Sequence, residues 1–411
     1  MFRSRLLSLA LILTFAASAH AQRRYSLGTA VNLTGGLANN LYGFAAPVQS
    51  PNQPLSRFYG AFPSVSLVST GAHSVLDTSY SFGFNRTRTG QNLDQQSHAA
   101  SVNLSNTLSS AWKLDLSDSF MSSSNAVTFN ALRNVASEPT TTFVFSPVTT
   151  QFMSRSNTAN AAATYQYTDH SSLAFTMAHN FLDYGSGNGF ASGALLKQQR
   201  FSGDIAYNYR TARQESWTLG YSAAYFNFLQ SENAYSQTAH AGYSNNVFRD
   251  FKLSFSAGIS DIQSLSTQSP GTQSPGTGGG HIGYNSSASL GKNITNSYFL
   301  LYYTQTSGDI SGLGTLSDTR RAGFSFNHAS RRASEFVDIS AFDTKGTLGN
   351  PYSLRGASAT GSFGLVLAKD WSVQIGGIYQ KYDTASSFGF AQKNVFLSLR
   401  YNNPTLWKGL R

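Results

Sequence analysis

The segment from Phe201 to Phe228 constrains the fold most, because it contains two runs in which apolar residues recur at every second position. The apolar residues of the two runs are Phe201, Ile205, Tyr207 and Tyr209, then Trp217, Leu219, Tyr221, Ala223 and Tyr225. A β-strand sends successive side chains to opposite faces, so each run predicts a strand with one apolar face and one small, polar face. The charged connection 210–215 predicts a hairpin turn in water.

Similar runs follow one another from about residue 60 to residue 401, and a further run begins at Tyr25. Short polar connections alternate with longer ones that are richer in Gly, Ser, Asn and Pro. The longer connections cover residues 121–155, 183–197, 261–280, 304–318 and 344–354. Counting from Tyr25 gives 18 strands, and omitting residues 25–68 gives 16. We favour 18, because the first run can then pair with the last and leave the sheet without edges.

The composition favours a membrane-embedded sheet over a soluble one. Charged residues make up 12% of the chain and aromatic residues 13%, whereas a soluble domain has roughly 25% charged residues. The chain after residue 21 has no run of 18 apolar residues that would predict a membrane-spanning helix. We therefore predict an all-β fold, a single closed antiparallel transmembrane β-barrel with short periplasmic turns and long extracellular loops.

The first residues predict a secretory signal peptide. Arg3 and Arg5 precede an apolar stretch, residues 6–17, and Ala19-His20-Ala21 has the spacing of a cleavage site. An uncleaved anchor is the alternative. We assign residues 1–21 to the signal peptide, 22–402 to the barrel and 403–411 to a short periplasmic tail. The chain has no cysteine, which excludes disulfides and a lipidated N-terminal cysteine and fits a Gram-negative cell envelope.

The net charge of +10 does not predict nucleic-acid binding, because no basic helix or interleaved basic and aromatic platform is present. Many cations lie in the predicted turns instead, where they can contact acidic lipid head groups. These cations are Arg210, Arg213, Arg249, Lys292, Arg331, Arg332 and Lys369.

Motifs for catalysis are missing from the sequence. No HExxH, GxSxG or cysteine-based motif occurs, so we expect no enzyme activity, no cofactor, and no catalytic, cofactor-binding or metal site. A hydrolase sited at one rim is the competing hypothesis. It would need a histidine and a serine or aspartate within hydrogen-bond reach, and alternation alone does not reveal such a pairing.

The signal peptide and the repeated strands resemble bacterial outer-membrane β-barrels of the general porin class. The resemblance extends over residues 25–401, and the end of the last run, Asn394, Phe396, Leu399 and Tyr401, is similar to the closing strand of that class. It implies a location in the cell outer membrane and insertion by the barrel-assembly machinery. The partners it implies are outer-membrane lipid, lipopolysaccharide and small polar solutes, with a homo-oligomer as one possible assembly. The function it implies is passive diffusion of small hydrophilic solutes; the alternative is a non-conducting barrel acting as an adhesin, a surface scaffold or a polysaccharide-export component.

Strand parity places nine charged residues on the predicted inner face. They are Asp77, Lys113, Asp115, Arg200, Asp204, Lys252, Arg321, Asp338 and Arg400. Opposed rows of such charges would orient polar solutes in an aqueous lumen. Alternatively, the charges pair with one another and only fill the lumen.

The longest connection, 121–155, is too apolar for a loop that extends into water. Its candidate constriction residues are Phe129, Leu132, Arg133, Phe143 and Phe145. We expect this loop to fold inward and narrow the lumen; a docked extracellular cap is the alternative.

Overall fold

The computed structural model describes residues 23–39, 56–88, 92–123, 154–184, 197–211, 215–228, 233–247, 251–265, 280–310, 316–346, 353–384 and 389–410. Within these ranges the chain forms one sheet of 18 strands. The strands are β1 Arg24–Ala38, β2 Ser56–Thr70, β3 Ser74–Arg88, β4 Asn92–Thr107, β5 Trp112–Ser123, β6 Ser154–Gln166, β7 Ser171–Tyr184, β8 Gln198–Arg210, β9 Ser216–Phe228, β10 Asn233–Val247, β11 Phe251–Leu265, β12 Gly280–Ile294, β13 Ser297–Ile310, β14 Leu316–Ala329, β15 Ala333–Gly346, β16 Ser353–Ala368, β17 Trp371–Thr384 and β18 Gly389–Leu410.

Every strand pairs antiparallel with its neighbours along the chain, and β1 also pairs with β18, which closes the barrel. The prediction of a closed antiparallel barrel with 18 strands is confirmed. Closure removes the sheet edges, so the backbone hydrogen bonds of the wall are made from strand to strand. Among the described residues, no helix has the length and apolar character needed to cross a membrane.

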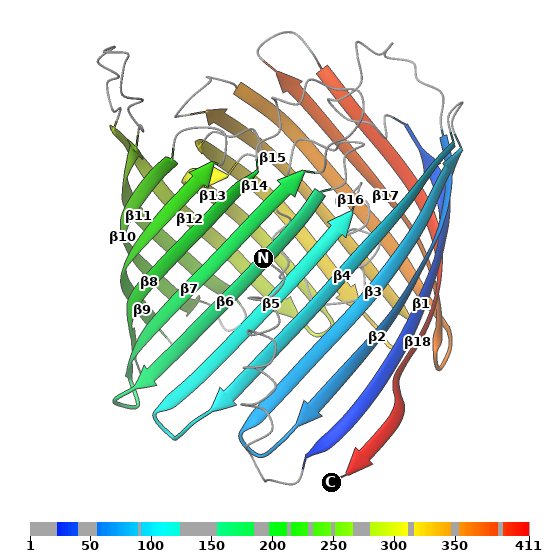
Figure 1. Ribbon diagram of the computed structural model, residues 1–411, viewed down its shortest axis with the longest axis horizontal. Helices are drawn as coiled ribbons and strands as arrows, with labels where there is room; N and C mark the ends of the chain where they lie inside the picture. The colour runs from blue at the N-terminus through cyan, green and yellow to red at the C-terminus, as the bar shows by residue number, and fades with distance from the viewer. Residues whose placement is uncertain are drawn as a thin grey trace.

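The tilted strands form a single wall around a central space (Figure 1). One end of the wall carries the short turns, such as 295–296 between β12 and β13 and 369–370 between β16 and β17. The C-terminus lies at this end, at the bottom of the view. Long connections, among them 39–55 and 124–153, join strands at the opposite end.

The closing seam is longer than the sequence pattern predicts. Residues 403–410, which we expected as a tail, continue β18 and pair with the first residues of β1, from Arg24↔Leu410 to Leu27↔Trp407. The register shifts between Leu27 and Thr29. This bulge lets the ladder continue past Pro404, which has no N–H to donate.

Alternation decides which residues face outward. In β9, Trp217, Leu219 and Tyr221 are 54%, 65% and 47% exposed, whereas Ala224 and Phe226, two residues of opposite parity, are buried. Opposite residues of an antiparallel ladder share a face. The register therefore continues one apolar outer face around the barrel and one inner face of mainly small and polar residues. The inner face also contains apolar clusters, one of them formed by Phe58, Ile378 and Phe396.

Large inward side chains are accommodated by glycines on adjacent strands. A Cβ atom at Gly376 of β17 would lie 2.5 Å from the Phe396 ring of β18, and one at Gly323 of β14 would lie 2.5 Å from the Tyr302 hydroxyl of β13. The same relation joins Gly36 to Phe58, Gly83 to Phe62, Gly291 to Tyr298 and Gly356 to Phe342. Because hydrogen replaces a side chain at these positions, the rings lie flat against the wall and do not project across the lumen.

Candidate functional site on the inner face

The register places all nine predicted charged residues on the inner face of the wall. Asp77 is opposite Asn103, for example, and Asp338 is opposite Ser325, whereas the neighbours of each along the strand belong to the apolar outer face. Within the described part of the chain, five of the nine positions take part in three contacts between a cationic or histidine side chain and a carboxylate. The arrangement as a set of solute-binding residues remains a prediction.

Two of these contacts join predicted residues directly. The Lys113 ammonium lies 2.9 Å from a carboxylate oxygen of Asp115, two residues further along β5. The Arg321 guanidinium of β14 lies 3.6 Å from Asp338 of β15. In these two pairs, a charge meets one of opposite sign on the same or an adjacent strand, so each pair produces a weaker field in the lumen than two separated charges would.

The Arg321 pair is part of a larger network. Arg321 donates to the Ser340 hydroxyl at 3.1 Å, and the Ser340 and Ser358 hydroxyls are 2.9 Å apart. Tyr302 approaches Asp338 from the other side, with its hydroxyl donating at 3.5 Å, and the Arg321 guanidinium lies 5.5 Å from the Tyr302 ring centre. Four strands, β13 to β16, are thereby linked along one stretch of inner wall.

The third contact includes a residue that parity alone did not single out. Asp204 of β8 is 3.6 Å from Nε2 of His240 on β10, two strands away. Gly220 of β9 lies between them, and a Cβ there would be 2.4 Å from the His240 ring nitrogen. The pairing depends on three aligned strands, and the only sequence signal for it is the glycine.

The other inward cations differ in their contacts. Arg200 of β8 lies 5.3 Å from the ring centre of Phe226 on β9, a cation–π contact. Lys252 is at the beginning of β11, directly after the turn from β10, and is exposed. Asp77 and Arg400 line a cavity.

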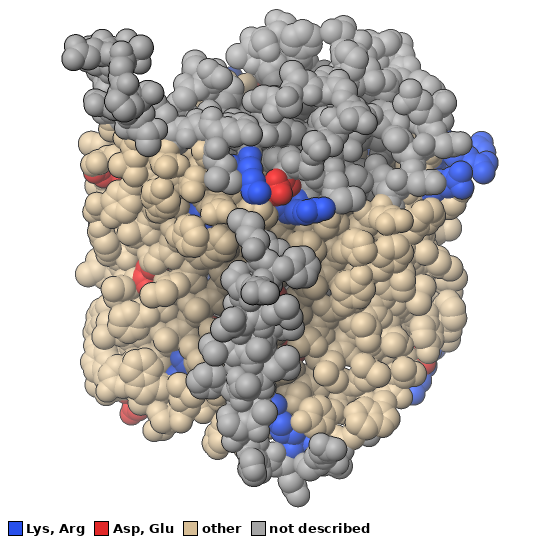
Figure 2. Space-filling view, in the orientation of Figure 1, with Lys and Arg blue, Asp and Glu red and all other residues tan. Residues whose placement is uncertain are grey.

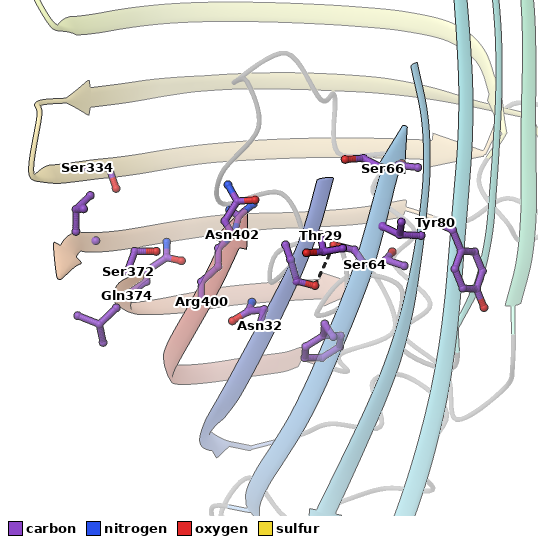
Figure 3. A pocket seen from close by; sticks show the side chains of 18 of the residues that line it. Thr29, Asn32, Ser64, Ser66, Tyr80, Ser334, Ser372, Gln374, Arg400 and Asn402 are labelled. Carbon is purple, nitrogen blue, oxygen red and sulfur yellow. Dashed lines mark hydrogen bonds between the residues drawn. The ribbon is translucent and has the colours of Figure 1, made fainter. Parts of the chain in front are cut away.

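This cavity, of about 580 Å³, lies against the inner wall formed by the first four and the last four strands. Along one inner row, Arg400 of β18 stands between Ser372 of β17 and Asn32 of β1, and Phe62 of β2 continues the row. Figure 3 shows Asn32, Ser372 and Arg400 around the space, with Arg400 as the labelled cation. The remaining lining is rich in small polar side chains, including Thr29, Ser64, Ser66, Ser79, Ser81, Ser101, Ser334, Gln374 and Asn402.

The candidate constriction residues Phe129, Leu132, Arg133, Phe143 and Phe145 lie outside the described residues. Within the described part of the chain, no group of three or more His, Cys, Asp or Glu side chains could hold a metal ion.

The outer face of the wall is largely uncharged. Figure 2 shows a broad band of mostly uncharged side chains, with charged side chains mainly toward its upper and lower margins. At the end with the short turns, outward aromatic rings contact one another in pairs. Trp112 and Tyr165 have ring centres 4.7 Å apart, and Trp217 and Tyr243 have ring centres 4.5 Å apart. An apolar band with aromatic girdles is the surface that a bilayer requires of a barrel.

Carboxylates also occur on this outer face, and Asp118 is one of them. Asp118 of β5 is opposite Val102 of β4, so it faces outward. The Asn157 side-chain amide of β6 donates to it at 2.7 Å. The alternation of apolar and polar residues predicts which face Asp118 lies on. It does not predict the hydrogen-bond partner of Asp118 on the neighbouring strand.

No family model matches the sequence, and no curated protein matches it. Similar solved structures were found at low identity. The outer membrane protein OpdK from Pseudomonas aeruginosa is 10% identical, with a TM-score of 0.44, over 93% of this chain and 99% of that one. OccAB4 from Acinetobacter baumannii is 9% identical, with a TM-score of 0.46, over 92% and 98%. The copper transporter OprC is 7% identical, with a TM-score of 0.47, over 88% of this chain and 62% of that one.

The assignment rests on the barrel itself. A closed wall satisfies the backbone hydrogen bonds, an apolar outer band with aromatic pairs at the short-turn end matches lipid, and a mainly polar inner face matches water. The chain is an outer-membrane β-barrel of porin-like architecture.

Proposed function

We propose that the barrel is a porin-like channel for passive diffusion of small hydrophilic solutes across the outer membrane. The observation that carries the proposal is the polar cavity of about 580 Å³ on the inner wall. Its volume is in the range of small-molecule sites, roughly 300–1,000 Å³. A barrel of 16–18 strands is also wide enough to leave an aqueous channel.

The side chains of this wall suit transient contact with a polar solute. Hydroxyl and amide groups such as those of Ser64, Ser372 and Gln374 can exchange hydrogen bonds with a solute that has lost part of its hydration. Conduction requires contacts weak enough to release the solute. The charged residues that line the cavity include one arginine and one aspartate. Because their charges are opposite, this wall favours polar solutes and does not strongly select cations or anions.

The polar lining supports a channel over a non-conducting barrel, because a barrel that served only as a scaffold could fill its interior with apolar packing. Transport by a passive channel requires no bond to be broken, so we continue to predict that the protein is not an enzyme.

Planar-bilayer recording tests the proposal. The purified full-length protein, at single-molecule density in a potassium chloride gradient, should give discrete and reproducible conductance steps. The same detergent preparation after boiling should give none. A correctly folded sample, verified by heat-modifiable gel migration, that inserts and remains silent would overturn the channel and favour the non-conducting alternative.

A further inference from the structure

A second surface of the barrel has no role in the proposed channel. It lies on the outer face, at the end of the wall that carries the long connections. Arg57 of β2 is directly opposite Arg88 of β3. Arg57 is also opposite Leu37 of β1, which is an exposed outer-face residue. Both arginines therefore face outward, where lipid head groups meet the wall.

Like charges directly opposite each other on a sheet destabilise it unless an anion lies between them. Among the described residues, no carboxylate forms an ion pair with Arg57 or Arg88, and both side chains are exposed. Arg355 of β16 lies at the same rim and on the same face, and it is paired with Asp343 at 3.3 Å. Among the described side chains, the rim thus contains one arginine, Arg355, that is paired with a carboxylate of the wall and one arginine pair that is not.

Two further cations lie near the arginine pair. Arg86 lies two residues before Arg88 on the outer face, and the register sets it opposite Tyr59 of β2 and Asp94 of β4. Lys393 of β18 is exposed at the same end, and its backbone N–H bonds to the Asn39 side chain after β1. Figure 2 shows Lys and Arg side chains at the upper right, over the upper ends of the strands drawn in blue in Figure 1.

Apolar residues adjoin the charges. Leu37 and Val395 of β18 are opposite each other in the row that contains Arg57, and they are 43% and 55% exposed. Tyr59 lies one outward position further into the band and is also exposed. The surface therefore offers guanidinium groups at the level of lipid head groups and an apolar wall below them.

Guanidinium groups bind phosphate with two parallel hydrogen bonds, and an adjacent pair can hold one phosphate between them. An apolar wall directly below suits acyl chains attached to that phosphate. The long-connection end of an outer-membrane barrel faces the outer leaflet. A phosphorylated glycolipid of that leaflet, the lipid A part of lipopolysaccharide, matches both chemistries.

We propose that Arg57 and Arg88 form the phosphate-binding centre of a lipid A site on the outer face of the barrel, with Leu37 and Val395 contacting its acyl chains. This inference depends on the rim alone and holds whether or not the lumen conducts.

Native mass spectrometry tests the proposal with the full-length protein in detergent and purified rough lipopolysaccharide as the probe. The R57Q/R88Q variant should retain about tenfold less lipopolysaccharide than wild type, as expected from loss of charge-assisted hydrogen bonds. R57K/R88K should retain an intermediate amount, because lysine keeps the charge and loses the bidentate geometry. R355Q is the matched control and should bind as wild type does.

Heat-modifiable gel migration verifies that each variant is folded. A parallel titration uses phosphatidylglycerol, which carries one phosphate and acyl chains without the sugar. Equal retention of lipopolysaccharide by R57Q/R88Q and wild type would overturn the proposal. So would an equal loss in R355Q, or stronger retention of phosphatidylglycerol than of lipopolysaccharide by the wild type.

Discussion

The imidazole of His240 reaches the carboxylate of Asp204 across an intervening strand, with 3.6 Å between Nε2 and Oδ2. The two side chains can meet because Gly220 has no side chain between them, and a Cβ atom there would be 2.4 Å from Nε2 of His240. One missing side chain thus determines which inner residues of β8 and β10 can meet.

Replacing Gly220 with alanine should move His240 away from Asp204 and destabilise the barrel by about 1–3 kcal/mol, the usual cost of overpacking. Urea unfolding in detergent, followed by gel migration, measures the change. Gly203 of β8 faces outward, and the nearest atom to a Cβ there is 3.8 Å away, so G203A is the matched control and should be tolerated. The double variant G220A/H240A should recover stability; if it does not, the clash with His240 is not the cause.

The network around Arg321 predicts a non-additive pair of substitutions. R321M leaves the half-buried Asp338 carboxylate without its cation and should cost about 1–3 kcal/mol. R321M/D338N removes both charges and should be less harmful than R321M alone. A double-mutant cycle in urea gives the coupling energy, and strictly additive effects would show that the 3.6 Å contact contributes no stability.

On the outer face, Asp118 and Asn157 should respond in opposite directions. N157A removes the amide that donates to the carboxylate at 2.7 Å and should destabilise the barrel by about 1–3 kcal/mol, the penalty for an unsatisfied polar group. D118N removes a charge from the lipid side and should be neutral or stabilising. Unfolding in lipid vesicles is the measurement; a loss of stability in D118N comparable to that in N157A would contradict a lipid-facing position.

If the lumen conducts, the charges of the cavity should set its weak ion preference. R400Q removes a cation from the wall and should shift the cation/anion permeability ratio roughly twofold toward cations. D77N should shift the ratio toward anions. Reversal potentials in a potassium chloride gradient measure both. R355Q, on the outer face, is the control and should leave the ratio unchanged; identical ratios in R400Q, D77N and wild type would separate the cavity from the conduction path.

Deleting residues 125–141 should raise single-channel conductance if the longest connection narrows the lumen, because removing a constriction widens the narrowest part of the conducting path. Removing the tandem TQSPG segment, residues 267–276, from another long connection is the control and should change conductance less. Unchanged conductance after the first deletion would rule out the constriction role and favour the cap.

The fold was largely predictable because its determinants are local. A period of two residues in each strand decides which residues face lipid, as Trp217, Leu219 and Tyr221 illustrate. Turn chemistry and the need for closure then fix the number of strands. The extension of β18 to Leu410 was not predicted, since it depends on extra residues of β18 next to Pro404, where the register shifts between Leu27 and Thr29 of the partner strand.

The sequence predicted which face of the wall the site residues lie on, but it did not predict their contacts. Parity placed Asp204 and Arg321 on the inner wall, but their partners depend on the register of two or three strands and on glycines such as Gly220 and Gly323. The cavity at Arg400 brings together residues from both ends of the sequence, from Thr29 to Asn402. No local pattern records that proximity.

Because Arg24 is opposite Leu410 at the seam between β1 and β18, the barrel does not require that β1 be the first strand in the sequence. A linker of a few residues there would join Leu410 to Arg24 without crossing the wall, and new ends could be opened at one of the long connections. A circularly permuted gene should therefore encode the same cylinder, with a different strand emerging first from the ribosome.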